Sequence, residues 1–224
     1  MRRLGRARHL TALAALATST ALGTPAAVAQ PCMCLTCFLG DSEAFRSSGA
    51  SMMPNIAPRA CLVVDRGAAA RAAVKPGDVV AYRRDDQDGT IYLTRIVATG
   101  GQTISLHGGR VSIDGTPIAT ERLAPLDTAD AVPATRCPEP RGDACRVPRL
   151  AETLPNGARY EVLDVLVDGM LDFMPERTVP AGHVFGLADN RDNGIDSRVM
   201  ETGPGFIALD QIVGPVTTVT KVPR

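Results

Sequence analysis

Short apolar runs separated by turn residues make up most of the chain after residue 60. Asp-Gly pairs at 88–89 and 114–115 end such runs, and this pair is a strong hairpin signal. In the longest run, Ile91 and Leu93 alternate with Tyr92 and Thr94, as on a strand that turns one face toward a core. The runs predicted as strands cover residues 61–64, 78–82, 90–98, 103–106, 110–113, 116–118, 160–167, 179–185 and 212–216. No helical pattern alternates with them, so we expect a mainly β protein built on antiparallel sheet.

Residues 119–177 differ from the runs on either side. Proline and charged residues are frequent there, and Cys137 and Cys145 enclose a short loop that is rich in both. We expect a β-rich inserted subdomain over residues 119–177, with a disulfide between Cys137 and Cys145. The remaining segments, 30–118 and 178–224, would then form one core.

The first 29 residues have the pattern of an export segment. Four arginines precede an uncharged apolar run over residues 10–22, and Ala27-Val28-Ala29 follows. This order predicts either a signal peptide that is cleaved after Ala29 or an uncleaved helical membrane anchor. In both cases the arginines stay inside and the remainder of the chain is exported.

Six cysteines agree with an exported, oxidising location. Beyond the predicted Cys137–Cys145 pair, the sequence allows three pairings, which it does not choose between, among Cys32, Cys34, Cys37 and Cys61. A metal or redox module at residues 32–37 is the alternative. That segment contains no histidine or acidic residue, so we expect disulfides and no metal.

Charge excludes some classes of partner. The 24 basic and 24 acidic residues balance, so no field is present that would gather nucleic acid. Nothing in the pattern calls for a cofactor. Lys75 and Lys221 are the only lysines, so there are few candidates for a lysine base.

Three further stretches carry the candidate chemistry. A serine is a weak nucleophile that needs a base to take its proton and donors to hold the oxyanion. The stretches are, in chain order, Ser51-Met52-Met53-Pro54, Gly77-Asp78-Val79-Val80 with Leu93-Thr94-Arg95-Ile96-Val97, and Ala188-Asp189-Asn190-Arg191-Asp192-Asn193-Gly194-Ile195-Asp196-Ser197-Arg198. In this order they resemble the type I signal peptidases, which are membrane-associated serine endopeptidases that remove signal peptides from exported proteins. The resemblance covers about three quarters of the chain, from Phe45 to Val216.

The resemblance implies roles for several residues. Ser51 would be the nucleophile, with its own backbone N–H as an oxyanion donor. Phe45, Ile56 and Leu93 would line shallow apolar pockets for small substrate residues, with ordinary core packing as the alternative. Arg95 would pair with Asp189, and Asp196 with Arg198; the alternative is that these are surface ion pairs of little energetic weight.

The chain departs from the family pattern at the catalytic base. The family's lysine position is occupied by Thr94, and a threonine hydroxyl cannot hold a proton taken from serine. In many members a serine orients that lysine, and Gly194 stands at its position. Ala188 stands at the position of a glycine in the family's last motif. Gly49 stands where some members have a serine, two residues before the nucleophile. A substitute base could come only from Lys75, Lys221, His107 or His183.

The resemblance therefore predicts a signal-peptidase-like β core and a signal peptidase I-like serine endopeptidase with an altered or absent base. Its substrates would be the signal peptides of exported preproteins, bound at the membrane surface on the periplasmic side. The alternative is a pseudoenzyme that binds signal peptides or a partner protein without cleaving them.

Overall fold

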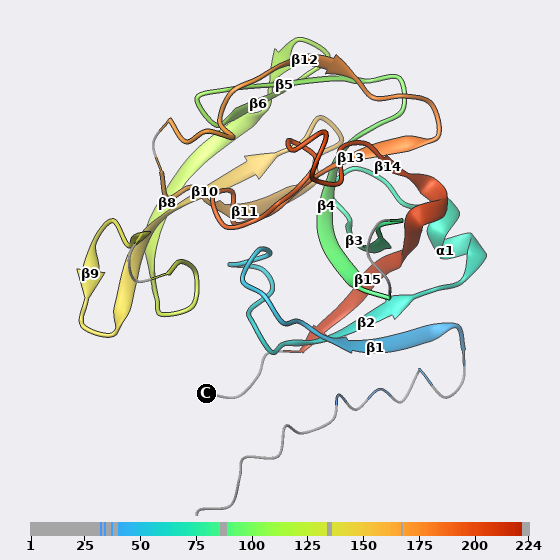
Figure 1. Cartoon of the computed structure of the whole chain (residues 1–224), viewed down its shortest axis with the longest axis horizontal. Coiled ribbons are helices and arrows are strands. Elements are labelled where there is room, and N and C mark those ends of the chain that lie inside the picture. Colours follow the sequence, from blue (N-terminus) through green and yellow to red (C-terminus); the bar gives the residue numbers. More distant parts are fainter. Residues whose placement is uncertain are drawn as a thin grey trace, which may run out of the picture. The chain divides into compact units, whose positions relative to one another are not determined.

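The computed structural model describes residues 32, 34, 37, 40–85, 89–133, 136–166 and 168–220. The predicted export segment at 1–29, the turn at 86–88 and Lys221 lie outside these residues. Strands dominate the described part, which has one α-helix, α1 (Ala68–Ala72), and a short 3-10 helix, η3 (Leu209–Gln211) (Figure 1). None of the described helices is both long and apolar enough to cross a membrane.

The largest sheet has seven strands, and all of its pairings are antiparallel. Its order is β1 (Ser42–Arg46), β2 (Cys61–Asp65), β15 (Ile212–Thr220), β3 (Val79–Arg83), β4 (Ile91–Thr99), β13 (His183–Leu187) and β14 (Ile207–Ala208). The last strand of the chain, β15, lies between two early strands, β2 and β3 (Figure 1). The predicted antiparallel, mainly β fold is confirmed.

A second sheet comes from the segment predicted as an insertion. Its order is β11 (Arg159–Leu163), β10 (Ala144–Thr153) and β8 (Ala119–Thr128), with β9 (Pro140–Arg141) paired to β10. The long strands β8 and β10 carry many charged residues, and cross-strand ion pairs accommodate some of them. Nε and one terminal nitrogen of Arg146 each lie 2.8 Å from a carboxylate oxygen of Asp127, and Arg149 pairs with Glu161.

A third sheet joins chain segments that are far apart in sequence. Its order is β12 (Met174–Thr178), β5 (Thr103–His107), β6 (Arg110–Ile113) and β7 (Thr116–Pro117). The hairpin β5–β6 turns at His107, as its glycines predicted. Strand β12 belongs to the predicted insertion but pairs with β5 of the predicted core. The division at 118/119 and 177/178 stays a prediction.

One apolar core is shared by all three sheets. Val97 and Phe185 of the largest sheet, Ile104 of the third and Val162 of the second are each at most 1% exposed and belong to a single cluster. Burial of such side chains stabilises a fold by about 1.5–3 kcal/mol each. The sheets therefore hold one another in place around the site that the motifs form.

All six cysteines are paired as disulfides: Cys32 with Cys61, Cys34 with Cys37, and Cys137 with Cys145. This arrangement leaves no thiolate in the segment around residues 32–37 to hold a metal.

Candidate active site

Ser51 lies on a turn between β1 and β2 that is anchored on both sides. The N–H of Met53 donates to the carbonyl of Ala50 at 3.1 Å. The side chain of Met52 enters an apolar cluster under the largest sheet, whereas that of Met53 enters a different cluster formed largely by the second sheet. Ser51 itself, directly before these two buried residues, is partly exposed. The two methionines that follow the serine therefore fix its turn to both sheets.

Ser51 lines a small cavity of about 160 Å³. Phe45 of β1 and Leu93 of β4 form apolar parts of its wall, and β1 is an edge strand of the largest sheet. Ile56 does not line this cavity. It is 2% exposed and packs with Met52, Ala60 and Leu62, which is the core-packing alternative.

Arg95 and Asp189 form a buried, two-pronged ion pair. Nε and one terminal nitrogen of Arg95 each lie 2.7 Å from a carboxylate oxygen of Asp189. Asn55, which follows the Ser51 turn, donates to the same carboxylate at 2.7 Å. Burial alone would lower the pKa of Arg95, but the hydrogen bonds and charge of Asp189 raise it. The pair ties β4 to the last motif and to the serine turn.

Asp196 and Arg198 form a second buried pair. Nε and a terminal nitrogen of Arg198 lie 2.9 and 2.8 Å from the two carboxylate oxygens of Asp196. Asp196 also accepts from the N–H of Ala188 at 2.9 Å, and Arg198 donates to the carbonyl of Arg191 at 2.5 Å. Both this pair and the Arg95–Asp189 pair are buried, and together they fix the conformation of the loop from 188 to 198.

Thr94 is buried beside β13, with 2% of its surface exposed. Its hydroxyl donates to the carbonyl of Leu187 at 3.3 Å, and its side chain fills the space that a Cβ on Gly186 would need. Within the described part of the chain, neither the hydroxyl nor the backbone N–H of Ser51 has a hydrogen-bond partner. Among the described residues, the N–H is therefore open to an acceptor, and no basic group contacts the hydroxyl.

Gly194 brings the last motif next to the serine. A Cβ atom on Gly194 would lie 3.5 Å from the Cβ of Ser51 and would overlap the methyl group of Ala188. The place where the family carries an orienting serine is thus close to Ser51, and Ala188 fills it.

The candidate substitute bases lie elsewhere. His183 lines a different cavity, and its Nδ1 lies 3.0 Å from the carbonyl of Ala181. His107 packs edge-on against Phe173, and Lys75 is an exposed turn residue. Arg46 and Tyr92 are the ionisable residues among those that line the Ser51 cavity in the described structure, and arginine does not act as a base at neutral pH.

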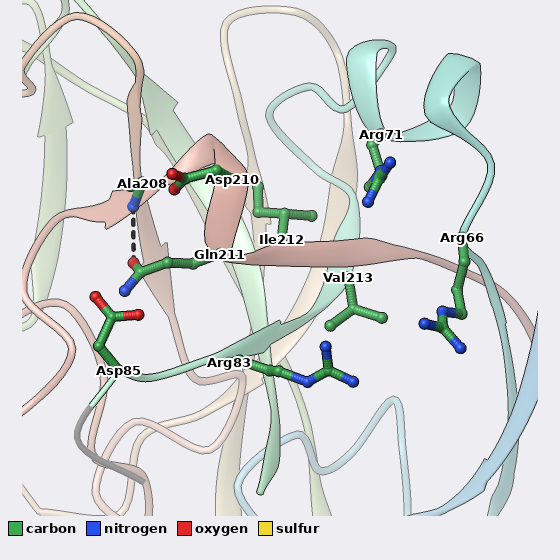
Figure 2. Close-up of a pocket in the computed structure, with 9 residues that line it drawn as sticks. All are labelled: Arg66, Arg71, Arg83, Asp85, Ala208, Asp210, Gln211, Ile212 and Val213. Carbon is green, nitrogen blue, oxygen red and sulfur yellow. Dashed lines mark hydrogen bonds between the residues drawn. The ribbon is translucent and has the colours of Figure 1, made fainter. Parts of the chain in front are cut away.

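Two larger cavities lie away from the motifs. One, of about 430 Å³, is shown in Figure 2, where the guanidinium groups of Arg66, Arg71 and Arg83 surround Val213 while Asp85 and Asp210 lie on the opposite side. The other measures about 680 Å³ and includes His183. Neither shares a lining residue with the Ser51 cavity, so size does not identify the site here.

Among the described residues, one group of carboxylates is close enough to share a metal ion. The ligand atoms of Asp164, Asp172 and Asp192 lie within 4.8 Å of one another. Burial, together with the charges of Asp172 and Asp192, raises the pKa of Asp164 to about 6. Acidic clusters are common without an ion, and this one assigns no metal. The expectation of a metal-free site stays a prediction.

The motif analysis missed two asparagines of the last motif and a buried pair. Asn190 and Asn193 bond carbonyl groups of other segments, and Arg191 pairs with Glu152 of β10 at 2.5 Å. The sequence contained a signal for these residues, because several polar residues directly follow an apolar run. It could not identify their partners, which lie more than 35 residues away in the chain.

Comparison with known proteins agrees with the motifs. A signal peptidase I of Bacillus amyloliquefaciens and the signal peptidase I T of Bacillus subtilis are each 27% identical over 172 residues, which are 77% of this chain and 70% of the relative. One from Pseudomonas aeruginosa is 30% identical over 125 residues, covering 54% of this chain and 38% of that protein.

A crystal structure of a signal peptidase I from Enterococcus faecalis aligns with 64% of this chain and 97% of its own, at 20% identity and a TM-score of 0.35. The family model described as signal peptidase, peptidase S26, matches residues 17–220. The chain therefore belongs to the signal peptidase family, peptidase S26.

Proposed function

We propose that the cavity beside Ser51 receives the signal peptide of an exported preprotein, and that Ser51 is the nucleophile of a signal peptidase I-like serine endopeptidase whose general base is altered or absent. The observation that carries this proposal is the cavity itself, because Phe45, Leu93 and Ser51 line one space of about 160 Å³. A space of this size can hold the side chain of one substrate residue. A substrate residue held there would lie next to the Ser51 hydroxyl.

The edge strand β1 supports peptide binding. Among the described strands it pairs with β2 alone, so its other side offers backbone groups to an extended peptide. Phe45 and Arg46 stand at the end of β1 and line the same cavity as Ser51. A peptide added along this edge would therefore place successive residues along the cavity toward the serine.

The missing base limits the expected rate. General-base catalysis contributes about 10²- to 10⁴-fold, and a catalytic group that lacks one member keeps only about 10³- to 10⁴-fold over water. The Ser51 N–H and a well-placed peptide would supply that residual. We therefore expect cleavage that is slow compared with that of a lysine-containing relative.

The same arrangement favours a second candidate, a binding protein without turnover. The hydroxyl of Thr94 donates to Leu187, and Ala188 fills the position of the orienting serine, so both members of the base are lost together. In either role we propose that the protein works on the periplasmic side of the cell membrane, at the membrane surface, and uses no cofactor and no nucleic acid.

The test compares the full chain with its Ser51→Ala variant in detergent, using a signal-peptide-bearing preprotein and a labelled signal peptide. Cleavage after a small-x-small site by the wild type alone establishes the endopeptidase. Equal binding by both proteins without cleavage establishes the binding protein. If the wild type neither cuts nor binds the peptide, both candidates are wrong.

A further inference from the structure

Asn190 joins the Ser51 turn to the inserted sheet. Its backbone N–H donates to the carbonyl of Ser51 at 2.9 Å. Its side-chain Nδ2 donates to the carbonyl of Ala50 at 3.1 Å and to that of Ala131 at 2.6 Å. Asn190 is fully buried, so water does not compete for these bonds. One side chain thus bonds a residue of the serine turn and a residue of the insertion.

The orientation of this amide is fixed by its surroundings. Both hydrogens of Nδ2 have carbonyl acceptors, so a flipped amide would set Oδ1 against two carbonyl oxygens. In the orientation present, Oδ1 is buried and has no partner in the described part of the chain. A buried acceptor without a hydrogen bond lowers stability, yet the folded protein retains one at Oδ1 of Asn190. The two donor contacts therefore determine how Asn190 sits.

The insertion supports the other end of this contact. The carbonyl of Ala131 also accepts from Nδ2 of Asn193 at 3.0 Å. Ala131 is fully buried in the apolar cluster that contains Met53 of the serine turn and Cys145 of the Cys137–Cys145 disulfide. The disulfide, the Ala131 carbonyl and the serine turn therefore share one packed unit.

The backbone around Asn190 also lies against the inserted sheet. The N–H of Leu163, the last residue of β11, donates to the carbonyl of Asp189 at 2.8 Å, and the N–H of Arg191 donates to the carbonyl of Leu163 at 2.9 Å. Residues 189–191 are thus held between β11 on one side and Ser51 on the other. The path from the insertion to the serine consists entirely of direct contacts.

We propose that the inserted sheet positions the candidate nucleophile, with Asn190 as the positioning residue and the Cys137–Cys145 disulfide as the element that holds Ala131 in place. This inference rests on the proposed function, in which Ser51 must meet a bound signal peptide. It assigns to the insertion a part in the site, although no residue of the insertion lines the Ser51 cavity.

Hydrogen exchange of the full chain tests the coupling without any need for turnover. Asn190→Asp keeps the shape of the side chain and removes both donors. We expect amide exchange in residues 47–56 and 129–133 to accelerate by about tenfold or more, as the loss of two buried hydrogen bonds implies. The matched control is Val179→Ala, a cavity change in the shared core that does not touch these contacts and that lowers global stability. It should not accelerate exchange selectively in those two segments.

Two milder variants keep the test decisive if Asn190→Asp does not fold. The double change Cys137→Ser and Cys145→Ser removes the disulfide, and Asn193→Ala removes one donor to Ala131. Each should accelerate exchange in residues 47–56, with a smaller effect from Asn193→Ala. Unchanged exchange there in the folded variants, or the same pattern in Val179→Ala, overturns the proposal.

Binding of a labelled signal peptide separates this inference from the proposed function. We expect Asn190→Asp, or the double cysteine variant if it alone folds, to weaken binding or Ser51-dependent cleavage about tenfold or more, beyond any loss in Val179→Ala. If the wild type binds no peptide but the variants still accelerate exchange in residues 47–56, the coupling holds and the proposed function fails. If the wild type binds and every folded variant binds equally well, the positioning role is wrong.

Discussion

The methyl group of Ala188 occupies the space that a side chain on Gly194 would need, and a Cβ atom at position 194 would lie only 3.5 Å from the Cβ of Ser51. Type I signal peptidases have the opposite arrangement by resemblance, with glycine at the first position and serine at the second. The two differences are therefore one sterically linked change. A serine cannot be restored at 194 while alanine stays at 188.

Rebuilding the base should consequently require three changes. We expect the triple variant Thr94→Lys, Gly194→Ser and Ala188→Gly to cleave a signal-peptide substrate about 10²- to 10⁴-fold faster than the wild type, the range for a general base. Position 94 is buried, so desolvation would lower the pKa of the new amine toward a useful value. The measurement is single-turnover cleavage of a labelled preprotein.

The informative comparison is the double variant that keeps Ala188. It should be slower than the triple variant by at least tenfold, since the overlap displaces the new hydroxyl. Ser51→Ala added to the triple variant should abolish the gain. Equal rates for the double and triple variants would contradict the steric link.

The Arg95–Asp189 pair should dominate the stability of the site. Asp189→Asn leaves Arg95 buried without its counter-charge and should lower the free energy of unfolding by about 3–5 kcal/mol. Glu43→Gln breaks the Arg66–Glu43 pair, which is about half exposed, and should cost under about 1 kcal/mol. Urea unfolding of the two variants measures both. Similar losses of unfolding free energy in the two variants would show that burial does not make the Arg95–Asp189 pair more stabilising than an exposed pair.

Phe45, Leu93 and Ile56 were predicted as pocket residues, and the structure divides them. Leu93 lines the Ser51 cavity, so Leu93→Ala should favour a larger substrate side chain there. We expect the ratio of the affinity for a peptide with leucine at the cavity position to that for the alanine peptide to rise by about tenfold. Ile56 is core, so Ile56→Ala should lower stability by about 2–4 kcal/mol and leave that ratio unchanged. Peptide titration of both variants decides. A changed affinity ratio in Ile56→Ala would show that Ile56 contributes to the substrate pocket and contradict this prediction.

Asp164 should make stability depend on pH. Its pKa is raised from 3.8 to about 6 in the folded chain, so the folded state binds more protons than the unfolded state between these values. Stability contributed by this group is therefore present at low pH and is lost as the pH rises through about 6. Asp164→Asn should then be more stable than the wild type at pH 7.5 by about 1–2 kcal/mol after allowance for partial exposure, with little difference at pH 4.

Chemical unfolding at the two pH values measures this difference. Asp143→Asn, at an exposed turn position, serves as the control and should give the same small change at both. A pH-independent effect of Asp164→Asn would show that burial and the charges of Asp172 and Asp192 do not raise the pKa of Asp164.

Strand prediction succeeded for short apolar or alternating runs, as in β2, β4 and β6, because residue type along a few consecutive positions is local information. The insertion was expected to be β-rich, but the strands β8 and β10 were not located within it, because their charged residues interrupt the apolar pattern. Most of those residues lie at least partly exposed, and Asp127 and Arg146 pair across the strands at a position set by register. Glu152 of β10 is buried and pairs instead with Arg191 of the last motif. The short helix α1 was also missed, since its run of alanines is exposed and has no apolar face.

By itself, the sequence determined the family and the antiparallel β class, because these follow from residue types in a fixed order. By resemblance it also proposed Ser51 as the candidate nucleophile and placed Thr94 at the family's lysine position. The tertiary structure alone decided that Ala188 and Gly194 form one unit, that Ile56 is core while Leu93 lines the cavity, and that Asn190 reaches the insertion. Each of these depends on contacts between residues distant in the chain. Such contacts arise only when the sheets pack, so no local pattern records them.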